Sequence, residues 1–176
     1  MKLNTFKNGW YVLYVRSCQE KKVHNLLQEN QCESFLPLIE TTRQWSDRRK
    51  VLHKPLFPCY VFVKNNSAKD FYKALNIEGA CTYIRFGKEY AQIADEEINR
   101  IKLLLNADGV KDLEINSKEP FIGEKYKINH GPLNGLDCEV VRINSENRVM
   151  VRFDSIRQNI TATISKHLLE EYTVAV

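Results

Sequence analysis

Residues 10–15, with the sequence WYVLYV, form the longest uninterrupted apolar run in the chain. The run is short and rich in β-branched and aromatic side chains, so it predicts a buried β-strand. A helix is expected over residues 19–30, because Val23, Leu26 and Leu27 recur at helical spacing between polar residues. Six apolar residues fall far short of the roughly 20 that a membrane-spanning helix needs. No membrane span is therefore expected.

The same kinds of pattern continue through the first 106 residues. Strands are expected at 34–40, 55–63 and 81–86, and helices at 68–75 and 95–106. The order β-α-β-β-α-β-α indicates an α+β domain in which helices cover one face of an antiparallel sheet.

Residues 41–54, TTRQWSDRRKVLHK, contain few core-forming side chains, and they predict a hairpin that projects from this domain. The segment carries five cationic side chains: Arg43, Arg48, Arg49, Lys50 and Lys54. Such a hairpin can simply be a solvated arm. Trp45 among the cations favours nucleic acid instead, because Arg binds phosphates and an indole stacks on unpaired bases. Both interpretations stay open.

The second half of the chain has a different character. Residues 107–120 show no sustained period and predict a linker. Short strands are then expected at 124–128, 137–143, 148–153 and 158–164, a spacing typical of a small β-barrel. The sequence thus predicts a domain over 1–106, a linker over 107–120 and an all-β barrel over 121–176.

Composition and charge narrow the classes of function. The chain has 176 residues, 43% hydrophobic and 27% charged, which excludes wholesale disorder. Residues 1–106 carry 17 Lys and Arg against 11 Asp and Glu, whereas residues 107–176 carry 9 against 11, so the N-terminal part is the one drawn to polyanions. The first nine residues lack a secretory pattern, so a cytoplasmic protein is expected.

The sequence shows no grouping of residues that is typical of a catalytic or metal site. Five cysteines without a CxxC pair indicate reduced thiols rather than a disulfide framework or a zinc site. The four histidines are scattered, and neither a phosphate loop nor a nucleophile elbow is present. We expect no catalysis, no cofactor and no metal.

An aromatic stripe is the most unusual feature. Tyr14 lies on the first strand, while Phe57, Tyr60 and Phe62 lie on or just before another, where Tyr60 and Phe62 share a face. Core packing explains such a stripe. The uncovered face of a one-sided sheet could equally dock a partner helix.

Three motifs in order resemble the NusG family of transcription elongation factors. They are WYVL at 10–13 followed by EKKV at 20–23, PLFPCYVFV at 55–63, and GPLNG at 131–135. The resemblance covers nearly the whole chain and implies an NGN domain, a linker and a C-terminal KOW domain. PLFP at 55–58 and YIRFG at 83–87 look more like the specialised antiterminators of the RfaH and UpxY type.

The resemblance implies that the NGN domain binds RNA polymerase. Side chains expected to meet the clamp helices of the β′ subunit are Tyr14, Phe57, Pro58, Tyr60, Phe62, Phe86 and Ile101. The gate loop of the β subunit would face the start of the second helix, at Asp70, Phe71 and Tyr72. The non-template DNA strand would meet Arg16, Lys21, Lys22 and Arg85, and the arm with Arg43, Arg48, Arg49 and Lys50 could reach upstream DNA.

The KOW motif is expected at Gly131, Pro132, Leu133, Gly135 and Leu136. Leu136 replaces an aromatic that housekeeping members present to Rho or to a small-subunit ribosomal protein. This replacement suits an antiterminator. Cys18, Cys59 and Cys138 stand where family members often have Gly, so tight turns that tolerate a side chain are expected there. The alternating β-branched residues of this domain predict a stable β-barrel rather than a helical form.

These expectations combine into a monomeric, non-enzymatic elongation and antitermination factor for specific operons, such as capsule operons. Two alternatives stay open. A housekeeping NusG would assist Rho termination, and a KOW-type RNA- or ribosome-binding protein would use the basic arm and ignore polymerase.

Overall fold

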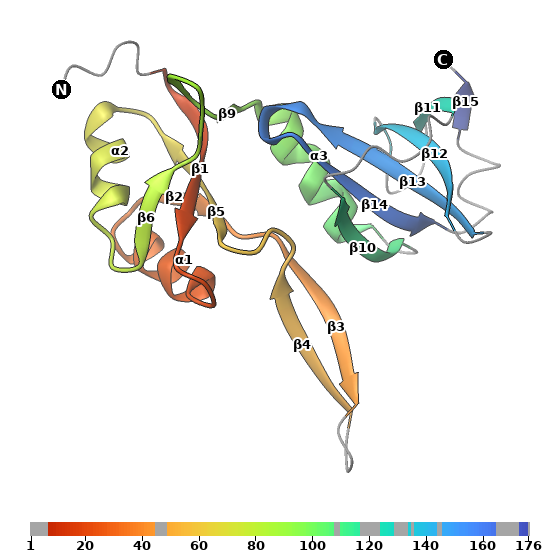
Figure 1. The fold of residues 1–176 in the computed structure, drawn as a ribbon, viewed down its shortest axis with the longest axis horizontal. Helices are drawn as coiled ribbons and strands as arrows, with labels where there is room; N and C mark the ends of the chain where they lie inside the picture. Colours follow the sequence, from red (N-terminus) through yellow and green to blue (C-terminus); the bar gives the residue numbers. More distant parts are fainter. Residues whose placement is uncertain are drawn as a thin grey trace. The chain divides into compact units, whose positions relative to one another are not determined.

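The computed structural model describes residues 7–44, 49–107, 110–116, 124–128, 134, 136–143, 146–164 and 173–175. The chain divides into two compact units, Met1–Asp95 and Glu96–Val176. Figure 1 shows their strands and helices. No helix in the described residues is long and apolar enough to span a membrane.

The N-terminal unit is an antiparallel sheet with two helices. Its elements are β1 (Gly9–Val15), α1 (Glu20–Glu29), β2 (Glu33–Phe35), β3 (Leu38–Gln44), β4 (Arg49–Pro55), β5 (Tyr60–Asn65), α2 (Ala68–Leu75), β6 (Ala80–Tyr83), β7 (Arg85–Phe86), β8 (Glu89–Tyr90) and β9 (Gln92–Ile93). The main sheet has the order β2-β5-β1-β6, and β9 pairs with the start of β1. The strand predicted from the WYVLYV run is confirmed as a central strand.

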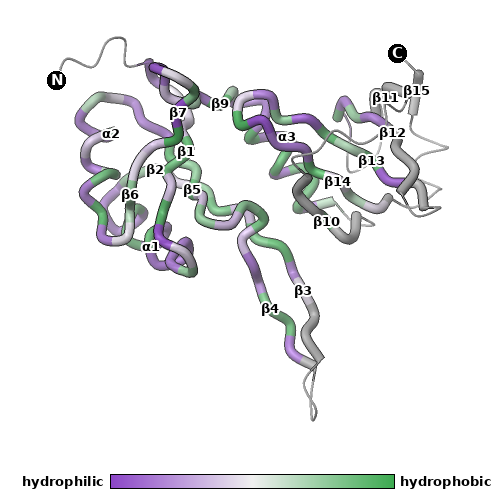
Figure 2. Tube along the Cα trace, in the orientation of Figure 1, coloured by the Kyte–Doolittle hydropathy of each residue, from purple (hydrophilic) through white to green (hydrophobic). Residues whose placement is uncertain are grey.

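Both helices cover the same face of this sheet. Val23 and Leu27 of α1 and Phe71 of α2 belong to one buried cluster with the side chains of β1 and β5 that point to that face. Figure 2 shows the hydrophobic residues along β1 and β5. The α2 helix begins after Ser67, whose hydroxyl accepts the backbone N–H of Asp70 at 3.2 Å.

A buried polar pair ties β5 to β6 within this core. The Asn65 amide donates to the Tyr83 hydroxyl at 3.0 Å, and Asn65 is fully buried. Burial raises the pKa of Tyr83 well above its ordinary value of 10, while the Asn65 hydrogen bond lowers it by a smaller amount. The pair satisfies groups that would otherwise be costly to bury.

Three predicted strands have different bounds in the structure. The strand expected over 34–40 is interrupted at Leu36 and Pro37, which separate β2 from β3. Proline has no N–H to donate to a ladder, and the Pro37 carbonyl instead accepts the N–H of Leu56 at 2.8 Å. The strand expected over 81–86 is divided at Ile84, and the one expected over 55–63 begins only at Tyr60.

The projecting hairpin is confirmed as β3 paired with β4, a two-stranded sheet that extends away from the rest of the N-terminal unit (Figure 1). The pairs run from Leu38 opposite Pro55 to Gln44 opposite Arg49. The tip residues that contain Trp45 and Arg48 lie outside the described residues.

In its described residues, the C-terminal unit consists of the helix α3, a short 3-10 helix and a second antiparallel sheet. Its elements are α3 (Asp95–Asn106), β10 (Val110–Asn116), β11 (Glu124–Ile128), β12 (Asp137–Ile143), β13 (Glu146–Phe153), the short 3-10 helix η1 (Asp154–Ile156), β14 (Gln158–Ile164) and β15 (Thr173–Ala175). The sheet order is β10-β14-β13-β12-β11-β15. The four predicted strands are all found; the described pairings form a six-stranded sheet and do not by themselves show a closed barrel.

The predicted linker is wrong over 110–116, because these residues form β10 and pair with β14. The register shifts between Lys111 and Glu114, and this irregularity breaks the period-2 alternation that would reveal a strand in the sequence. Helix α3 also differs from the prediction, because from Glu96 onward it falls in the C-terminal unit rather than ending the first domain.

Polar contacts hold α3 to this unit. Glu97 accepts the backbone N–H of Ser155 at 3.3 Å, and Arg100 pairs with Asp137 at 3.4 Å. Ile98, Ile101 and Leu104 make the buried stripe of the helix.

The tight-turn positions predicted for three cysteines are confirmed for two. Cys18 and Cys59 have φ angles of 62° and 64°, in the left-handed region that favours glycine. Cys138 instead lies within β12 and is buried. The prediction is wrong there because a strand position needs no positive φ.

Candidate functional site

The face of the main sheet opposite the helices carries exposed aromatic side chains. Tyr14 of β1 is 40% exposed, and it lies opposite the half-buried Tyr60 of β5. Their rings meet edge to face with centroids 6.1 Å apart. Pro58, in the turn that leads into β5, is also exposed. These residues place three of the seven predicted polymerase contacts at one corner of the sheet.

A β-bulge on the neighbouring strand widens this corner. Tyr14 pairs with Thr82, whereas Val15 pairs with Ala80, so Cys81 is the extra residue. A bulge turns two successive side chains toward one face, and both Cys81 and Thr82 are exposed. We call Tyr14, Pro58, Tyr60, Cys81 and Thr82 the outer patch. No sequence pattern marked Cys81 or Thr82, because a bulge leaves no periodic signal.

Three other predicted contacts are buried, which corrects the expectation that all seven form one open surface. Phe57 is 2% exposed, and Phe62 and Ile101 are fully buried. The Phe62 ring packs against Phe57 at 5.3 Å between centroids and against Phe35 at 6.1 Å. Phe57 and Phe62 therefore support the sheet from within. Ile101 belongs to the buried stripe of α3 in the other unit.

The seventh predicted contact, Phe86, is 37% exposed on the short β7–β8 hairpin. Arg85 precedes it and stacks over the Tyr90 ring, with the guanidinium carbon 4.2 Å from the ring centroid. Arg85 also donates to the Tyr90 hydroxyl. Gly87, with φ of 65°, allows the tight turn of this hairpin. The hairpin thus presents an aromatic next to an oriented cation.

The predicted gate-loop residues have three different environments. The Asp70 carboxylate accepts the Ser67 hydroxyl at 2.8 Å and completes the helix cap. Phe71 is 1% exposed and stacks on Tyr83 with centroids 4.0 Å apart. Tyr72 is 47% exposed. The expectation of a contact is wrong for Phe71, because it is part of the core, and Tyr72 is the accessible aromatic of the three.

The cations predicted to meet DNA near α1 are exposed. Arg16, Lys21 and Lys22 all lie at the surface. Lys22 pairs with Glu78 at 2.7 Å. This hydrogen bond and the charge of Lys22, with a smaller contribution from Arg16, hold the pKa of Glu78 below its ordinary value. The carboxylate is therefore charged at neutral pH and offsets part of the positive charge at this corner.

The β3–β4 hairpin has cations at register positions on both of its faces, with Arg49 on the face of Glu40 and His53. Lys50 lies opposite Arg43 in the register, and Lys54, opposite Ile39, lies on the same face as Lys50. Glu40 pairs with His53 at 3.9 Å on the other face. Lys50 and Lys54 are exposed. Like charges placed opposite each other are unfavourable unless an anion compensates them.

The predicted KOW motif lies mostly outside the described residues, which exclude Gly131, Pro132, Leu133 and Gly135. Leu136 is described and is fully buried. The expectation that this leucine replaces an aromatic of housekeeping members stays a prediction.

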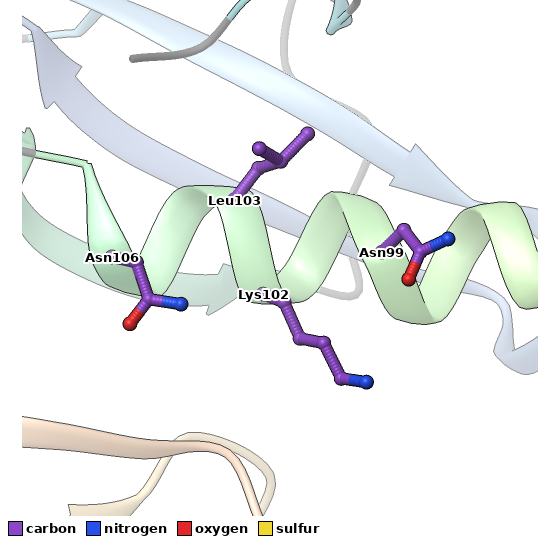
Figure 3. Close-up of a pocket in the computed structure, with 4 residues that line it drawn as sticks. All are labelled: Asn99, Lys102, Leu103 and Asn106. Atoms are coloured by element: carbon purple, nitrogen blue, oxygen red, sulfur yellow. The ribbon is translucent and has the colours of Figure 1, made fainter.

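A depression along α3 lacks groups that could exchange protons. It is lined by Asn99, Lys102, Leu103 and Asn106, which all come from this helix (Figure 3). Its polar groups are two amides and one ammonium, without a carboxylate or an imidazole to exchange protons. Among the described residues, no group of three or more His, Cys, Asp and Glu side chains could hold a metal ion.

Comparison with known proteins identifies a family. The model of the family "Transcription termination factor nusG" matches residues 8–102, which is more than half of the chain. A structure on domain interaction in Thermotoga maritima NusG is similar with 20% identity and a TM-score of 0.49, over 90% of this chain and 94% of that one.

Two structures of the MjSpt4:Spt5 complex also match. Conformation A has 16% identity and a TM-score of 0.32, over 95% of this chain and 97% of that one. Conformation B has 15% identity and a TM-score of 0.33, over 95% and 96%.

Proposed function

The chain belongs to the NusG family of transcription factors, and from this premise we propose that it binds RNA polymerase through the outer patch. The edge-to-face pair of the exposed Tyr14 and the half-buried Tyr60 carries the proposal. Exposing a large aromatic side chain to water is unfavourable. An edge-to-face pair of tyrosines provides a rigid apolar surface to which a helix can bind. The family consists of non-enzymatic transcription factors.

The partner we propose for the outer patch is the pair of clamp helices of the β′ subunit. Phe57 and Phe62 are buried, Phe62 next to Tyr60 along the same face of β5, and they would set the shape of the patch without touching the partner. Tyr72, exposed on α2, is proposed to contact the gate loop of the β subunit. Contacts to both subunits would keep the polymerase clamp closed and so suppress pausing.

Antitermination at specific operons, such as capsule operons, is the activity we propose. The motifs PLFP and YIRFG that resemble specialised antiterminators support it. The burial of Leu136 also supports it, because this position offers no side chain to Rho. In this proposal the N-terminal unit is an NGN domain and the C-terminal strands belong to a KOW domain, with a small-subunit ribosomal protein as its second partner.

A nucleic-acid contact by the hairpin is a second component of the proposal. The observation that favours it is the face shared by the exposed Lys50 and Lys54, whereas Glu40 and His53 pair on the other face. Each phosphate neutralised by a cation adds about 0.9 to the salt slope of binding to duplex DNA. The variant Lys50→Gln should therefore lower that slope by about one and weaken binding similarly for all sequences. The non-template strand is proposed to meet Arg16, Lys21 and Arg85.

The experiment that tests the polymerase contact uses the full chain and core RNA polymerase. Tyr14→Ala and Tyr60→Ala should each weaken binding by about tenfold or more, as truncation of an aromatic anchor does. An isolated fragment that contains the β′ clamp helices should compete with the unaltered chain. Glu29→Ala, at the far end of α1, is the matched control. Absence of binding by the unaltered, folded chain would overturn the proposal.

A transcription assay separates the two kinds of family member. An antiterminator should increase readthrough of a terminator placed behind its recruiting leader, with or without Rho. A housekeeping factor should instead raise Rho-dependent termination. Unchanged termination, together with tight RNA binding by the hairpin, would favour the KOW-type RNA- or ribosome-binding alternative.

A further inference from the structure

The turn that leads into β5 has an unusual conformation. The Phe57 carbonyl accepts the N–H of Tyr60 at 3.2 Å, so residues 57–60 close a β-turn. Proline at its second position fixes φ near −65°, while Cys59 at the third position has a φ of 64°. This combination defines a type II turn, which favours glycine at the third position. Cys59 therefore holds a strained conformation that something must stabilise.

A buried carboxylate from α1 meets this turn. Glu20 is 6% exposed, and its Oε1 accepts the backbone N–H of Cys59 at 2.8 Å. A hydrogen bond to a charged acceptor is stronger than one between neutral groups. Glu20 is also the first residue of α1, where a negative charge complements the helix dipole.

The carboxylate can select between two forms of the turn. Type I and type II turns differ by a flip of the peptide between their second and third residues. In the type II form, the Cys59 N–H points at Glu20. In a type I form, the Pro58 carbonyl would take its place and face the carboxylate, which would repel it. Glu20 thus favours the form that the backbone alone would avoid.

The conformation of the turn sets the position of the outer patch. The Cys59 carbonyl accepts the N–H of Val15 at 2.8 Å, so the turn is joined to the end of β1. Pro58 lies within the turn, and Tyr60 follows it and pairs with Tyr14. A flip of the middle peptide would break the link to Glu20 and move the Pro58 ring relative to the two tyrosines.

We infer that Glu20 is a positioning residue for the docking surface. Its buried carboxylate holds the Phe57–Tyr60 turn in the type II form, so that Pro58 and Tyr60 are already arranged before a partner arrives. Preorganisation of this kind raises affinity because less conformational freedom is lost on binding. The expected effect of Glu20 on affinity rests on the proposed function, whereas its effect on the conformation of the turn does not.

Four variants of the full chain isolate this role. Glu20→Ala removes the acceptor, and Glu20→Gln keeps an amide oxygen that can accept the same N–H without the charge. Glu29→Ala removes a carboxylate from the exposed far end of α1 and is the matched control. Cys59→Gly, added to Glu20→Ala, lets the backbone adopt the left-handed conformation without strain.

Amide hydrogen exchange at Cys59 tests the state of the turn without any partner. Glu20→Ala should exchange at least about tenfold faster than the unaltered chain, and Glu20→Gln should lie between them. Glu29→Ala should leave the rate unchanged. An equal rate in Glu20→Ala and the unaltered chain would overturn the inference.

Affinity for core RNA polymerase tests the consequence. Glu20→Ala should weaken binding by about tenfold, and the added Cys59→Gly should restore it to within about twofold, because glycine regains the turn without Glu20. A general loss of stability would not be rescued in this way. If the turn loosens while affinity stays the same and Tyr60→Ala still weakens binding, Glu20 has no positioning role although the proposed function stands. If the unaltered chain does not bind, the proposed function and the positioning role both fail, and hydrogen exchange still decides whether Glu20 holds the turn.

Discussion

The two faces of the N-terminal sheet are built from the same strands but have different roles. On the inner face, Tyr11, Leu13 and Val15 are buried under both helices. On the outer face, Val12 is fully buried, whereas its neighbour along that face, Tyr14, is 40% exposed. The comparison teaches that alternation assigns a residue to a face, while local packing decides whether it is core or surface.

The largest expected effect comes from Phe62, a fully buried residue on the outer face. Phe62→Ala should lower the free energy of unfolding by about 3–5 kcal/mol, because it leaves a cavity between Phe35 and Phe57. Urea unfolding of the full chain measures it. Tyr60→Ala, two residues away on the same face, should cost only about 1 kcal/mol. Equal decreases in unfolding free energy for the two variants would show that Phe62 is no more part of the core than Tyr60.

A smaller effect is expected at the polar pair of the inner face. Tyr83→Phe should cost about 1–3 kcal/mol of unfolding free energy, because it leaves the buried Asn65 amide without its partner. Tyr72→Phe, on the exposed side of α2, is the control and should stay within about 0.5 kcal/mol of the unaltered chain. An unchanged free energy of unfolding in Tyr83→Phe would mean that the Tyr83 hydroxyl does not stabilise the fold.

Alkaline pH should weaken the inner face in particular. Burial raises the pKa of Tyr83, and of Tyr11 to a lesser degree, above the ordinary value of 10.0. The folded state therefore keeps protons that the unfolded state releases, so stability is fully present below about pH 10 and falls as pH rises further. Urea midpoints between about pH 8 and 11 measure the slope. Tyr83→Phe should make the decrease of the urea midpoint with pH shallower. An unchanged decrease would mean that groups other than Tyr83 cause it.

The smallest effect on stability is expected at Tyr14. Tyr14→Ala should change the free energy of unfolding by less than about 1 kcal/mol, since much of the ring is already in water. Leu13→Ala, the adjacent residue on the inner face, should cost about 2–5 kcal/mol. Thermal unfolding of the two variants compares them directly. A large loss in Tyr14→Ala would place this ring in the core and argue against a docking surface.

Periodicity predicted most of the elements, because a buried face imposes a repeat on the residues that line it. It placed β1, α1 and α2 nearly at their observed bounds. It failed at β10, where a register shift removes the alternation, and at Pro37, which divides one expected strand into two. Among the predicted polymerase contacts, Tyr14, Pro58 and Tyr60 lie together, whereas Phe57 and Phe62 are buried and pack against each other.

The sequence by itself determined the antiparallel α+β pattern, the charged hairpin and the resemblance to the NusG family, because these depend on residue types and on their local spacing. Only the tertiary structure decided which aromatics are exposed, which strand carries the bulge at Cys81, and that Glu20 meets the Cys59 turn. These features depend on residues far apart in the chain, such as Glu20 and Cys59, which are separated by 39 positions. No local pattern encodes such a contact, since folding alone brings its two partners together.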